Sequence, residues 1–542
     1  MSAKIQTPLG HAIPPASYHS LTAHMPTWSH SVRFAERDPE LIASLKTMYP
    51  RIILHKAVEK LATMIARKAS VTSETRCLPF TSFHAASQCV VFSTSASRGE
   101  NAVLQKDISI RIFDADVRFW VVFFPLSGFG TVHSFWNNSG TGIPSRRAEK
   151  SSKNLELLHE VYDDTPERKP ADGPVYGLIQ QRIATLLERA PAGPPRQAKV
   201  SPGDVFLFPT GMAAIYNLHR YLFQRYNSTS IQLGLAFVNT IHVLEDFGPG
   251  TKFLIEGTPG DIELLEEYLE DERKEGRKVQ ALWTEIPSNP LLITPDFGKL
   301  RLLADEYGFL LIVDDTIGSF CNIDLLGVAD VIVTSLTKSF SGYANVMGGS
   351  VSLNPSSPRY PELKQIFAES YSNDYFEEEA VVLERNSSDY LSRSAILNNN
   401  AARLVEYLND KANDPKSCVY RVYYPTTQSS LPNYQERMRR PTAEFTPGYG
   451  GLFSVELSTE EHAIAFYDNL NMHKGPHFGA PMALACPYAM ILYSKELEKS
   501  RYCDLSMAQV RIGVGLEDIE LLLADFKIAL EAADAVGKVK GE

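Results

Sequence analysis

Two short segments near the middle of the chain begin with residues that could bind a phosphate and an electron-poor ring. Thr210, Gly211 and Met212 follow the apolar run Val205–Phe208, so they lie where a strand leads into a helix. Free backbone N–H groups and the helix dipole at such a point suit a phosphate, although Thr210 could equally be an ordinary helix cap. Asp314 follows the apolar run Phe309–Val313, where its carboxylate could pair with a cationic ring nitrogen or a metal, or simply cap a helix.

Two further segments bring a lysine and an amide to similar positions. Lys338 stands beside Ser335 and Thr337, directly after the short apolar run Val331–Thr334. A lysine amine at a strand end can form a Schiff base while the hydroxyls bind a phosphate, and a solvated lysine is the alternative. Asn289, in a proline-rich segment, could hydrogen-bond a ligand or belong to a turn.

Each segment alone is weak, but the set in this order is specific. Ligands of an α/β sheet gather beyond the carboxyl ends of its strands. A phosphate-binding helix start, a strand-end acid and a lysine between hydroxyls are the parts needed to hold pyridoxal 5′-phosphate (PLP). In this interpretation Asp314 keeps the pyridine nitrogen protonated, and Lys338 carries the cofactor and later moves protons on the substrate.

The composition narrows the class of protein. The 542 residues are 44% apolar and 22% charged, a balance typical of globular domains. A net charge of −11 and a pI near 5.7 argue against binding of nucleic acid or an anionic membrane. Apolar runs are too short for a membrane span, and the N-terminus lacks a secretory signal, so we expect a cytoplasmic protein. The six cysteines lie far apart in sequence, which predicts neither a metal site nor a redox pair.

Alternating short apolar runs and helix-length segments predict an α/β fold with a mostly parallel sheet. We expect an N-terminal extension and arm at residues 1–150, a cofactor-binding α/β domain at 151–365 and a smaller C-terminal α+β domain at 366–542. The expected strands are Val117–Phe124, Val205–Phe208, Leu233–Val238, Lys252–Ile255, Val279–Trp283, Phe309–Val313 and Val331–Thr334. The expected helices are Asp38–Lys68, Val175–Arg189, Gly211–Tyr226, Asp261–Glu272, Pro295–Tyr307 and Leu516–Ala533.

The chain resembles the Cys/Met-metabolism family of PLP enzymes. The resemblance rests on Thr-Gly-Met at 210–212, Pro-Ser-Asn-Pro at 287–290, Val-Asp-Asp-Thr at 313–316, Ser-Leu-Thr-Lys at 335–338 and the segment 342–349. It implies a fold type I transferase with a seven-stranded sheet, PLP as cofactor and a homotetramer. The segment Val510–Glu517 is similar to the one that bears the family's carboxylate-binding arginine, here Arg511, and a guanidinium suits that bidentate task. The long N-terminal extension and residues 134–149 look most like fungal cystathionine γ-synthases.

Three departures from the family pattern stand out. Phe247 aligns with the tyrosine that stacks on the cofactor, and it can stack but cannot carry a proton. Residues 136–138 (Trp-Asn-Asn) align with a Tyr-x-Arg that the neighbouring subunit sends toward the phosphate, which leaves Arg146 or Arg147 as a replacement cation. His477 stands where the family has a serine near the substrate carboxylate, so we predict that it helps to select the substrate.

The resemblance implies a γ-replacement on an O-acyl-L-homoserine, with cysteine as the nucleophile and cystathionine as the product. Addition of an enolate carbon, as in relatives from fungal secondary metabolism, is the main alternative. γ-Elimination, simple sulfhydrylation and a catalytically silent relative are further alternatives. Small amino acids are therefore the expected partners.

Overall fold

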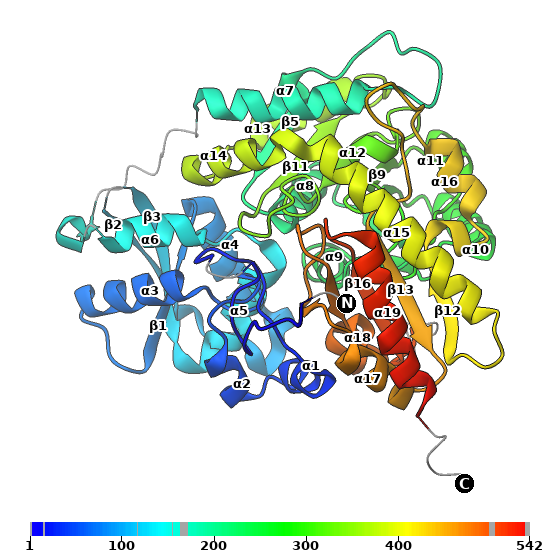
Figure 1. The fold of residues 1–542 in the computed structure, drawn as a ribbon. Coiled ribbons are helices and arrows are strands. Elements are labelled where there is room, and N and C mark those ends of the chain that lie inside the picture. The colour runs from blue at the N-terminus through cyan, green and yellow to red at the C-terminus, as the bar shows by residue number, and fades with distance from the viewer. Residues whose placement is uncertain are drawn as a thin grey trace.

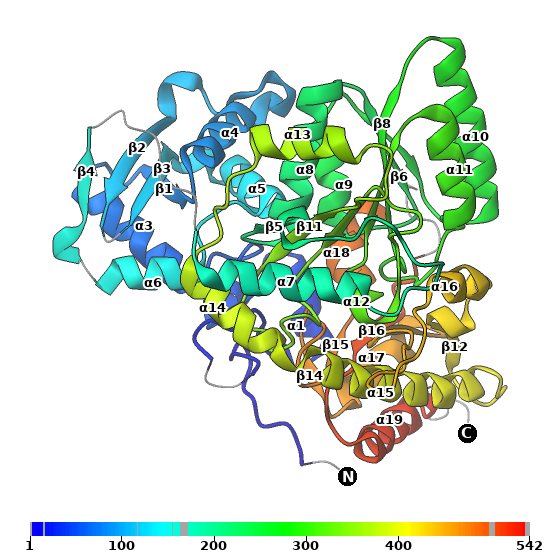
Figure 2. The same ribbon diagram turned by 90° about the horizontal axis from the view of Figure 1, so that it is seen from above.

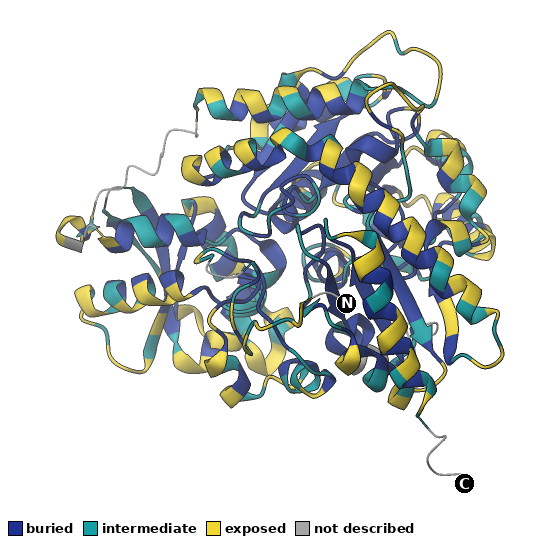
Figure 3. Cartoon of the chain, in the orientation of Figure 1, coloured by how far each residue is buried: buried dark blue, intermediate teal, exposed yellow. Residues whose placement is uncertain are grey.

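Three β-sheets organise the protein (Figure 1). The computed structural model describes residues 3–14, 17–115, 117–153, 155–162, 172–497 and 505–536. Figure 2 shows the N-terminal sheet on one side of the central sheet, with α10 and α11 at the opposite end. In Figure 3 the sheets are buried, while the outer faces of the surrounding helices are exposed.

The central sheet has seven strands in the order β5-β11-β10-β9-β8-β6-β7. All neighbours from β10 to β7 pair in parallel, and β11 runs antiparallel to both of its neighbours. The strands are β5 (Val205–Phe208), β6 (Thr229–Leu233), β7 (Thr251–Leu254), β8 (Val279–Glu285), β9 (Leu310–Asp314), β10 (Val331–Thr334) and β11 (Gly349–Leu353). The result is the mixed sheet of the predicted α/β class.

Helices cover both faces of this sheet, because side chains of a strand alternate between its faces. Leu310 and Ile312 of β9 pack in the core that contains α8, whereas Leu311 and Val313 pack in the core that contains α7 and α11. The covering helices are α7 (Pro174–Glu188), α8 (Gly211–Tyr226), α9 (Val238–Asp246), α10 (Pro259–Lys274), α11 (Phe297–Tyr307), α12 (Ser319–Asn322), α13 (Tyr360–Ser370) and α14 (Glu377–Asn386).

The N-terminal part forms an arm and a four-stranded antiparallel sheet in the order β1-β3-β2-β4. Its strands are β1 (Thr75–Phe80), β2 (Ser109–Asp114), β3 (Arg118–Pro125) and β4 (His159–Val161). Its helices are α1 (Trp28–Ala35), α2 (Pro39–Ser44), α3 (Lys56–Lys68), α4 (Phe83–Thr94), α5 (Phe129–Ser139) and α6 (Ser145–Lys153). The expected boundary at residue 150 cuts α6, and β4 beyond it belongs to this sheet.

The C-terminal part is a five-stranded sheet, in the order β12-β13-β16-β15-β14, with helices packed against it. Its strands are β12 (Val419–Tyr423), β13 (Leu452–Leu457), β14 (His473–Lys474), β15 (Leu484–Cys486) and β16 (Gln509–Gly513). Its helices are α15 (Tyr390–Ala412), α16 (Leu431–Arg437), α17 (Glu460–Asn469), α18 (Tyr488–Leu497) and α19 (Ile519–Asp534). The expected boundary at residue 365 falls inside α13.

Two expected elements differ from the structure, and one strand of the central sheet was not expected. The strand expected at residues 233–238 lies earlier in the chain. Strand β6 occupies Thr229–Leu233, and the next residues form a loop. Strand β11 was not expected. The helical stretch expected at 38–68 is two helices, α2 and α3, with Pro50 in the irregular segment between them, since proline breaks a helix interior. No helix in the described ranges is long and apolar enough to cross a membrane.

Candidate active site

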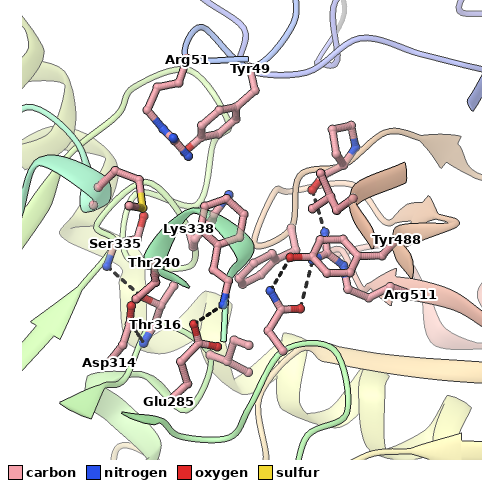
Figure 4. A pocket seen from close by; sticks show the side chains of 18 of the residues that line it. Tyr49, Arg51, Thr240, Glu285, Asp314, Thr316, Ser335, Lys338, Tyr488 and Arg511 are labelled. Carbon is pink, nitrogen blue, oxygen red and sulfur yellow. Dashed lines mark hydrogen bonds between the residues drawn. The ribbon is translucent and has the colours of Figure 1, made fainter. Parts of the chain in front are cut away.

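A cavity lies at the carboxyl ends of β8, β9 and β10, between the central sheet, the N-terminal arm and the C-terminal sheet (Figure 4). It encloses about 930 Å³, counting the part open to solvent. Five charged side chains line it: Arg51, Glu285, Asp314, Lys338 and Arg511. The cavity is therefore where the chemistry-bearing segments of the sequence meet.

Lys338 occupies the middle of this cavity (Figure 4). It follows β10 in a turn that the buried Leu336 fixes to the core. Its Nζ lies 3.3 Å from Nδ1 of His477 and 4.8 Å from the centre of the Tyr49 ring. Burial, followed by the charges of Arg511 and Arg51, lowers the pKa of Lys338 well below its ordinary value. The side chain is thus prepared to act as a neutral amine, the form that attacks carbonyls.

Asp314 ends β9 and faces the cavity, whereas the next residue points elsewhere. Its Oδ1 accepts a hydrogen bond from the Thr316 N–H at 2.9 Å. Burial raises its pKa from 3.8 to about 6. Asp315 is 2% exposed and accepts a hydrogen bond from the Thr334 hydroxyl at 2.5 Å, and it does not line the cavity. The geometry therefore offers Asp314 to a ligand.

Glu285 ends β8 directly beside Asp314, with which it pairs in the sheet register. Its Oε1 accepts a hydrogen bond from the Phe237 N–H at 2.7 Å, and Phe237 lines the cavity. Burial, followed by the charge of Asp314, raises the pKa of Glu285 well above its ordinary value. Because like charges so close disfavour one another, Asp314 and Glu285 disfavour each other's charged form, and the hydrogen bond from Phe237 to Glu285 fixes Phe237 at the cavity wall.

The start of α8 forms the cradle beside Ser335. Gly211 and Met212 line the cavity together with Ser335. A Cβ on Gly211 would lie 2.7 Å from the Ser335 Cβ, so only glycine allows this approach. Thr210 does not line the cavity: its hydroxyl accepts from the Ala213 N–H at 2.9 Å and donates to a backbone carbonyl. Thr210 is thus the helix cap that the sequence left open as the alternative.

Arg511 projects from β16 on the side of the cavity opposite Asp314 (Figure 4). It is 2% exposed and donates to Asn289 Oδ1 at 3.2 Å and to the Pro476 carbonyl at 2.7 Å. Its guanidinium carbon lies 3.8 Å from the centre of the Tyr488 ring, and Asn289 donates to the Tyr488 hydroxyl at 2.9 Å. The guanidinium is therefore held in one orientation at the cavity wall.

The structure brings most of the predicted site residues together. Those that line the cavity are Gly211, Met212, Asn289, Asp314, Ser335, Lys338 and Arg511. Thr337 does not: its hydroxyl donates to the Gly348 carbonyl and accepts from the Gly348 N–H, both at 3.1 Å. His477 is 1% exposed and does not line the cavity. Its Nδ1 contacts the Nζ of Lys338. Its predicted contact with substrate is thus replaced by a contact with the lysine.

The assignment of Phe247 as the stacking ring is wrong. Phe247 follows α9, and its ring stacks on Phe92 at 5.0 Å in the core shared with α5 and α8. Phe237 immediately precedes α9 and lines the cavity. The two rings are separated by a helix of nine residues, about 14 Å of helical rise. The end of β6 at Leu233 explains why Phe237, and not Phe247, lies at the cavity. Phe237 is the aromatic residue that follows the end of this strand closely.

Neither Arg146 nor Arg147, one of which was expected to supply the cation for the phosphate, lines the cavity. Arg146 pairs with Glu379, and Arg147 is buried and donates to the Thr81 carbonyl at 3.5 Å. Arg51 lines the cavity instead, together with Tyr49. The sequence does contain a Tyr-x-Arg that could have predicted this cation, Tyr-Pro-Arg at residues 49–51. It was not recognised because these residues lie inside the helix expected at residues 38–68.

Comparison with known proteins agrees with the cavity geometry in indicating a PLP enzyme. Residues 197–531 match the family described as Cys/Met metabolism PLP-dependent enzyme. The chain belongs to this family. Residues 57–144 match the fungal trans-sulfuration enzyme N-terminal domain, so the extension is a recognised part of fungal members.

Similar proteins cover nearly the whole chain. "Cystathionine gamma-synthase-like enzyme iboG2" of Amanita muscaria is 34% identical, over 97% of this chain and 96% of its own length. "Alanine racemase ungC" of Aspergillus violaceofuscus is 32% identical, over 97% of both chains. The cystathionine gamma-synthase of Neurospora crassa is 30% identical, over 97% of this chain and 98% of its own.

Solved structures show the same fold. The cystathionine gamma synthase of Xanthomonas oryzae pv. oryzae aligns with a TM-score of 0.53 and 20% identity, over 70% of this chain and 91% of its own. The cystathionine gamma-lyase of Lactobacillus plantarum aligns with a TM-score of 0.53 and 19% identity, over 69% and 90%. The fold is that of a fold type I PLP enzyme.

The cofactor of the family, PLP, fits the groups that line the cavity. The Nε of Arg51 is buried and has no hydrogen-bond partner among the described residues, so it is free to donate to an anion. Ser335 and the start of α8 line the same cavity, Asp314 is available for a ring nitrogen and Lys338 for a carbonyl carbon. Each reactive part of the cofactor therefore has a chemically matched partner.

Proposed function

We propose that this protein catalyses γ-replacement on an O-acyl-L-homoserine, with L-cysteine as the nucleophile and cystathionine as the product. The observation that carries the proposal is the position of Lys338 between Asp314 and Arg511 in one cavity. A γ-replacement needs one base that reaches both Cα and Cβ of an amino acid whose carboxylate is held, and this arrangement offers one. The relatives named as cystathionine gamma-synthases support the same reaction class.

The roles of the residues follow from their chemistry. When bound, PLP supplies an electron sink for carbanion chemistry on an amino acid. Arg51, Ser335 and the N–H groups at Gly211 hold its phosphate, and Asp314 holds the proton on its ring nitrogen. Phe237 presents a ring face to the cofactor.

The substrate is held from the other side. Arg511 and Asn289 bind its α-carboxylate, with the guanidinium donating two parallel hydrogen bonds. The Nζ of Lys338 would take the proton from Cα and, after passing it on to the bound cofactor, a second proton from Cβ, so that the γ-acyloxy group leaves as a carboxylate. After the nucleophile has added at Cγ, one proton returns to Cβ and one to Cα, and the proton of the thiol leaves with the carboxylate. His477, whose Nδ1 is hydrogen-bonded to Nζ, keeps the amine oriented toward the cavity.

The walls around these groups exclude water. Apolar side chains line the space between the arm and the C-terminal part: Phe34, Ile52, Ile215, Ile317, Phe478, Ile491 and Leu492. Such a surrounding disfavours hydrolysis of a reactive intermediate. It also accommodates a nucleophile with apolar substituents, so a carbon–carbon bond formed with an enolate carbon is the second candidate reaction.

The test is an incubation of the purified, PLP-loaded protein with O-acetyl- and O-succinyl-L-homoserine in D₂O. Cysteine, other thiols and carbonyl compounds are offered in turn, and the products are identified by mass spectrometry. γ-Replacement incorporates deuterium at Cβ as well as Cα, because both carbons lose a proton. Deuterium at Cα alone, with inversion of the homoserine ester at Cα, would instead assign the chemistry that the name of the relative "Alanine racemase ungC" suggests, and would refute the proposal.

We extend the proposal to a homotetramer, as the resemblance implies, and to a location in the cytoplasm. Sedimentation of the purified protein tests the tetramer, and fractionation of the source cells tests the location. A cytosolic enzyme of amino-acid metabolism would meet its substrates, small amino acids, in that compartment.

A further inference from the structure

The N-terminal arm reaches the cavity of its own chain. Tyr49 and Arg51 come from the segment between α2 and α3 and point toward Lys338 (Figure 4). Tyr49 is 8% exposed and Arg51 is 4% exposed. The Lys338 amine lies 4.8 Å from the centre of the Tyr49 ring, and the Arg51 guanidinium lies 5.1 Å from it.

Arg51 has a buried guanidinium nitrogen that finds no hydrogen-bond partner among the described residues. Among the described residues, three basic side chains line the cavity. Lys338 is bonded to His477, and Arg511 is fixed by Asn289 and the Pro476 carbonyl. Arg51 donates one terminal nitrogen to Asn137 and keeps its Nε free of protein partners. A buried guanidinium with an unused donor calls for an anion.

The arm is bound to the same chain at several points. Leu21 N–H donates to the Ala344 carbonyl at 2.8 Å, close after Lys338 in sequence. Met25 N–H donates to the Lys474 carbonyl at 3.0 Å, and the Lys474 amine donates to the Pro26 carbonyl at 2.9 Å. The two bonds to Lys474 fix the arm to β14 of the C-terminal sheet, and the bond to Ala344 fixes it to the loop after Lys338.

The rest of the N-terminal part is held equally well. Phe135 and Trp136 of α5 pack in one core with Met212 and Tyr216 of α8. Gly140 accepts the hydrogen bond from the Thr210 hydroxyl at 3.1 Å. The segment that carries Arg51 therefore cannot leave the cavity without breaking contacts at both of its ends.

We propose that Tyr49 and Arg51 complete the phosphate site within a single chain. The resembling family takes a Tyr-x-Arg from the neighbouring subunit for this task, whereas here the fungal N-terminal part supplies it in cis. The inference rests on the proposed PLP site but not on the reaction that follows. Each chain then holds a whole active site, and an assembly of several chains is not needed to bind the cofactor.

The first experiment separates the phosphate from the ring. Apoprotein with Arg51→Ala is titrated with PLP and with pyridoxal, which lacks the phosphate, and binding is followed by visible absorbance. Loss of a charge-assisted hydrogen bond should weaken PLP binding about 10- to 100-fold and leave pyridoxal binding as in the wild type. Arg33→Ala, in the same arm but paired with Asp38 away from the cavity, is the matched control and should change neither.

An equal loss for both ligands would show that Arg51 does not contact the phosphate, and would overturn the proposal. Arg51→Lys, which keeps the charge, checks that the fold survives and should recover part of the PLP affinity. This readout needs no substrate, so it stands even where the γ-replacement assay fails. Conversely, γ-replacement without the PLP-selective loss would reject only the role of Arg51.

The second experiment decides between one chain and two. Arg51→Ala and Lys338→Ala chains with different tags are co-expressed, and the mixed assembly is purified through both tags. If the arm acts in cis, every site lacks either Arg51 or Lys338, and the mixture regains neither tight PLP binding at the lysine nor turnover. If the arm came from the neighbour, one site of each mixed pair would be whole, and its recovery would overturn the proposal. An assembly that never mixes, with each purified variant monomeric, supports the single-chain site directly.

Discussion

Replacing Asp314 with asparagine should make the cofactor-free protein more stable at neutral pH and should lower its affinity for the cofactor. Burial raises the pKa of this carboxyl from 3.8 to about 6, so the folded state binds the proton more tightly than the unfolded chain does. A shift of about two pH units corresponds to about 3 kcal/mol. The substituted asparagine carries no charge, and its side-chain oxygen can still accept the hydrogen bond from the Thr316 N–H.

The sign of the pH dependence follows from linkage. Below about pH 4 the carboxyl is protonated in both states, so Asp314→Asn and wild type should be equally stable. Between about pH 4 and pH 6 the unfolded chain releases the proton first, and the wild-type apoprotein loses stability. Above about pH 6 the full penalty applies, and the variant should be more stable by about 3 kcal/mol.

The assay is urea unfolding of apoprotein at pH 4, 5, 6 and 7. Asp518→Asn serves as the control, because Asp518 is an exposed cap of α19 that asparagine can replace. In the same samples Asp314→Asn should bind PLP more weakly and lose several orders of magnitude in rate, since a neutral pyridine is a poor electron sink. A variant that is less stable than wild type at pH 7, or a larger rate loss from Asp315→Asn, would refute the reasoning.

Five other substitutions, grouped in four predictions, test the site. Lys338→Ala should abolish turnover, and borohydride reduction of the wild type should label Lys338; a label on another lysine would contradict the assignment. Phe237→Ala should alter the visible spectrum of bound PLP, whereas Phe247→Ala should leave it unchanged and cost about 3 to 5 kcal/mol of stability, measured by unfolding. His477→Ser removes the acceptor for the Lys338 ammonium, so the midpoint pH for PLP uptake should fall by about one unit, while the ratio of thiol to carbon products stays constant. Arg511→Lys should raise KM for the amino acid more than it lowers kcat, because the two-point contact with the carboxylate is lost; an unchanged KM would place the carboxylate elsewhere.

The central sheet and its ligand-facing ends were predictable from local patterns. Short apolar runs of β-branched and aromatic residues located β5, β7, β8, β9 and β10 to within about two residues. The carboxyl ends of neighbouring parallel strands meet at one edge, so Asp314 and Lys338 could be placed together before any coordinates. Strand β11 was not predicted because its small residues Gly349, Ser350 and Ser352 carry little hydrophobic signal.

The rest of the site depended on contacts that spacing does not encode. Arg51 reaches the cavity through packing between residues several hundred positions apart, as in the bond of Leu21 to Ala344. The choice between Phe237 and Phe247 turned on where β6 ends, and strand ends are the least certain feature of a sequence pattern. Pro50 did carry a local signal, since its presence forbids the helix expected across residues 38–68.

The charges of the cavity explain why these separate segments must meet. In the apoprotein, burial lowers the pKa values of Arg51 and Lys338 and raises those of Asp314 and Glu285, so each group is pushed toward its neutral form. A phosphate beside Arg51, a cationic ring nitrogen beside Asp314 and a substrate carboxylate beside Arg511 would each supply the missing opposite charge. Cofactor and substrate together thus stabilise a cavity that costs the empty protein stability, and this differential binding orients both around the Lys338 amine.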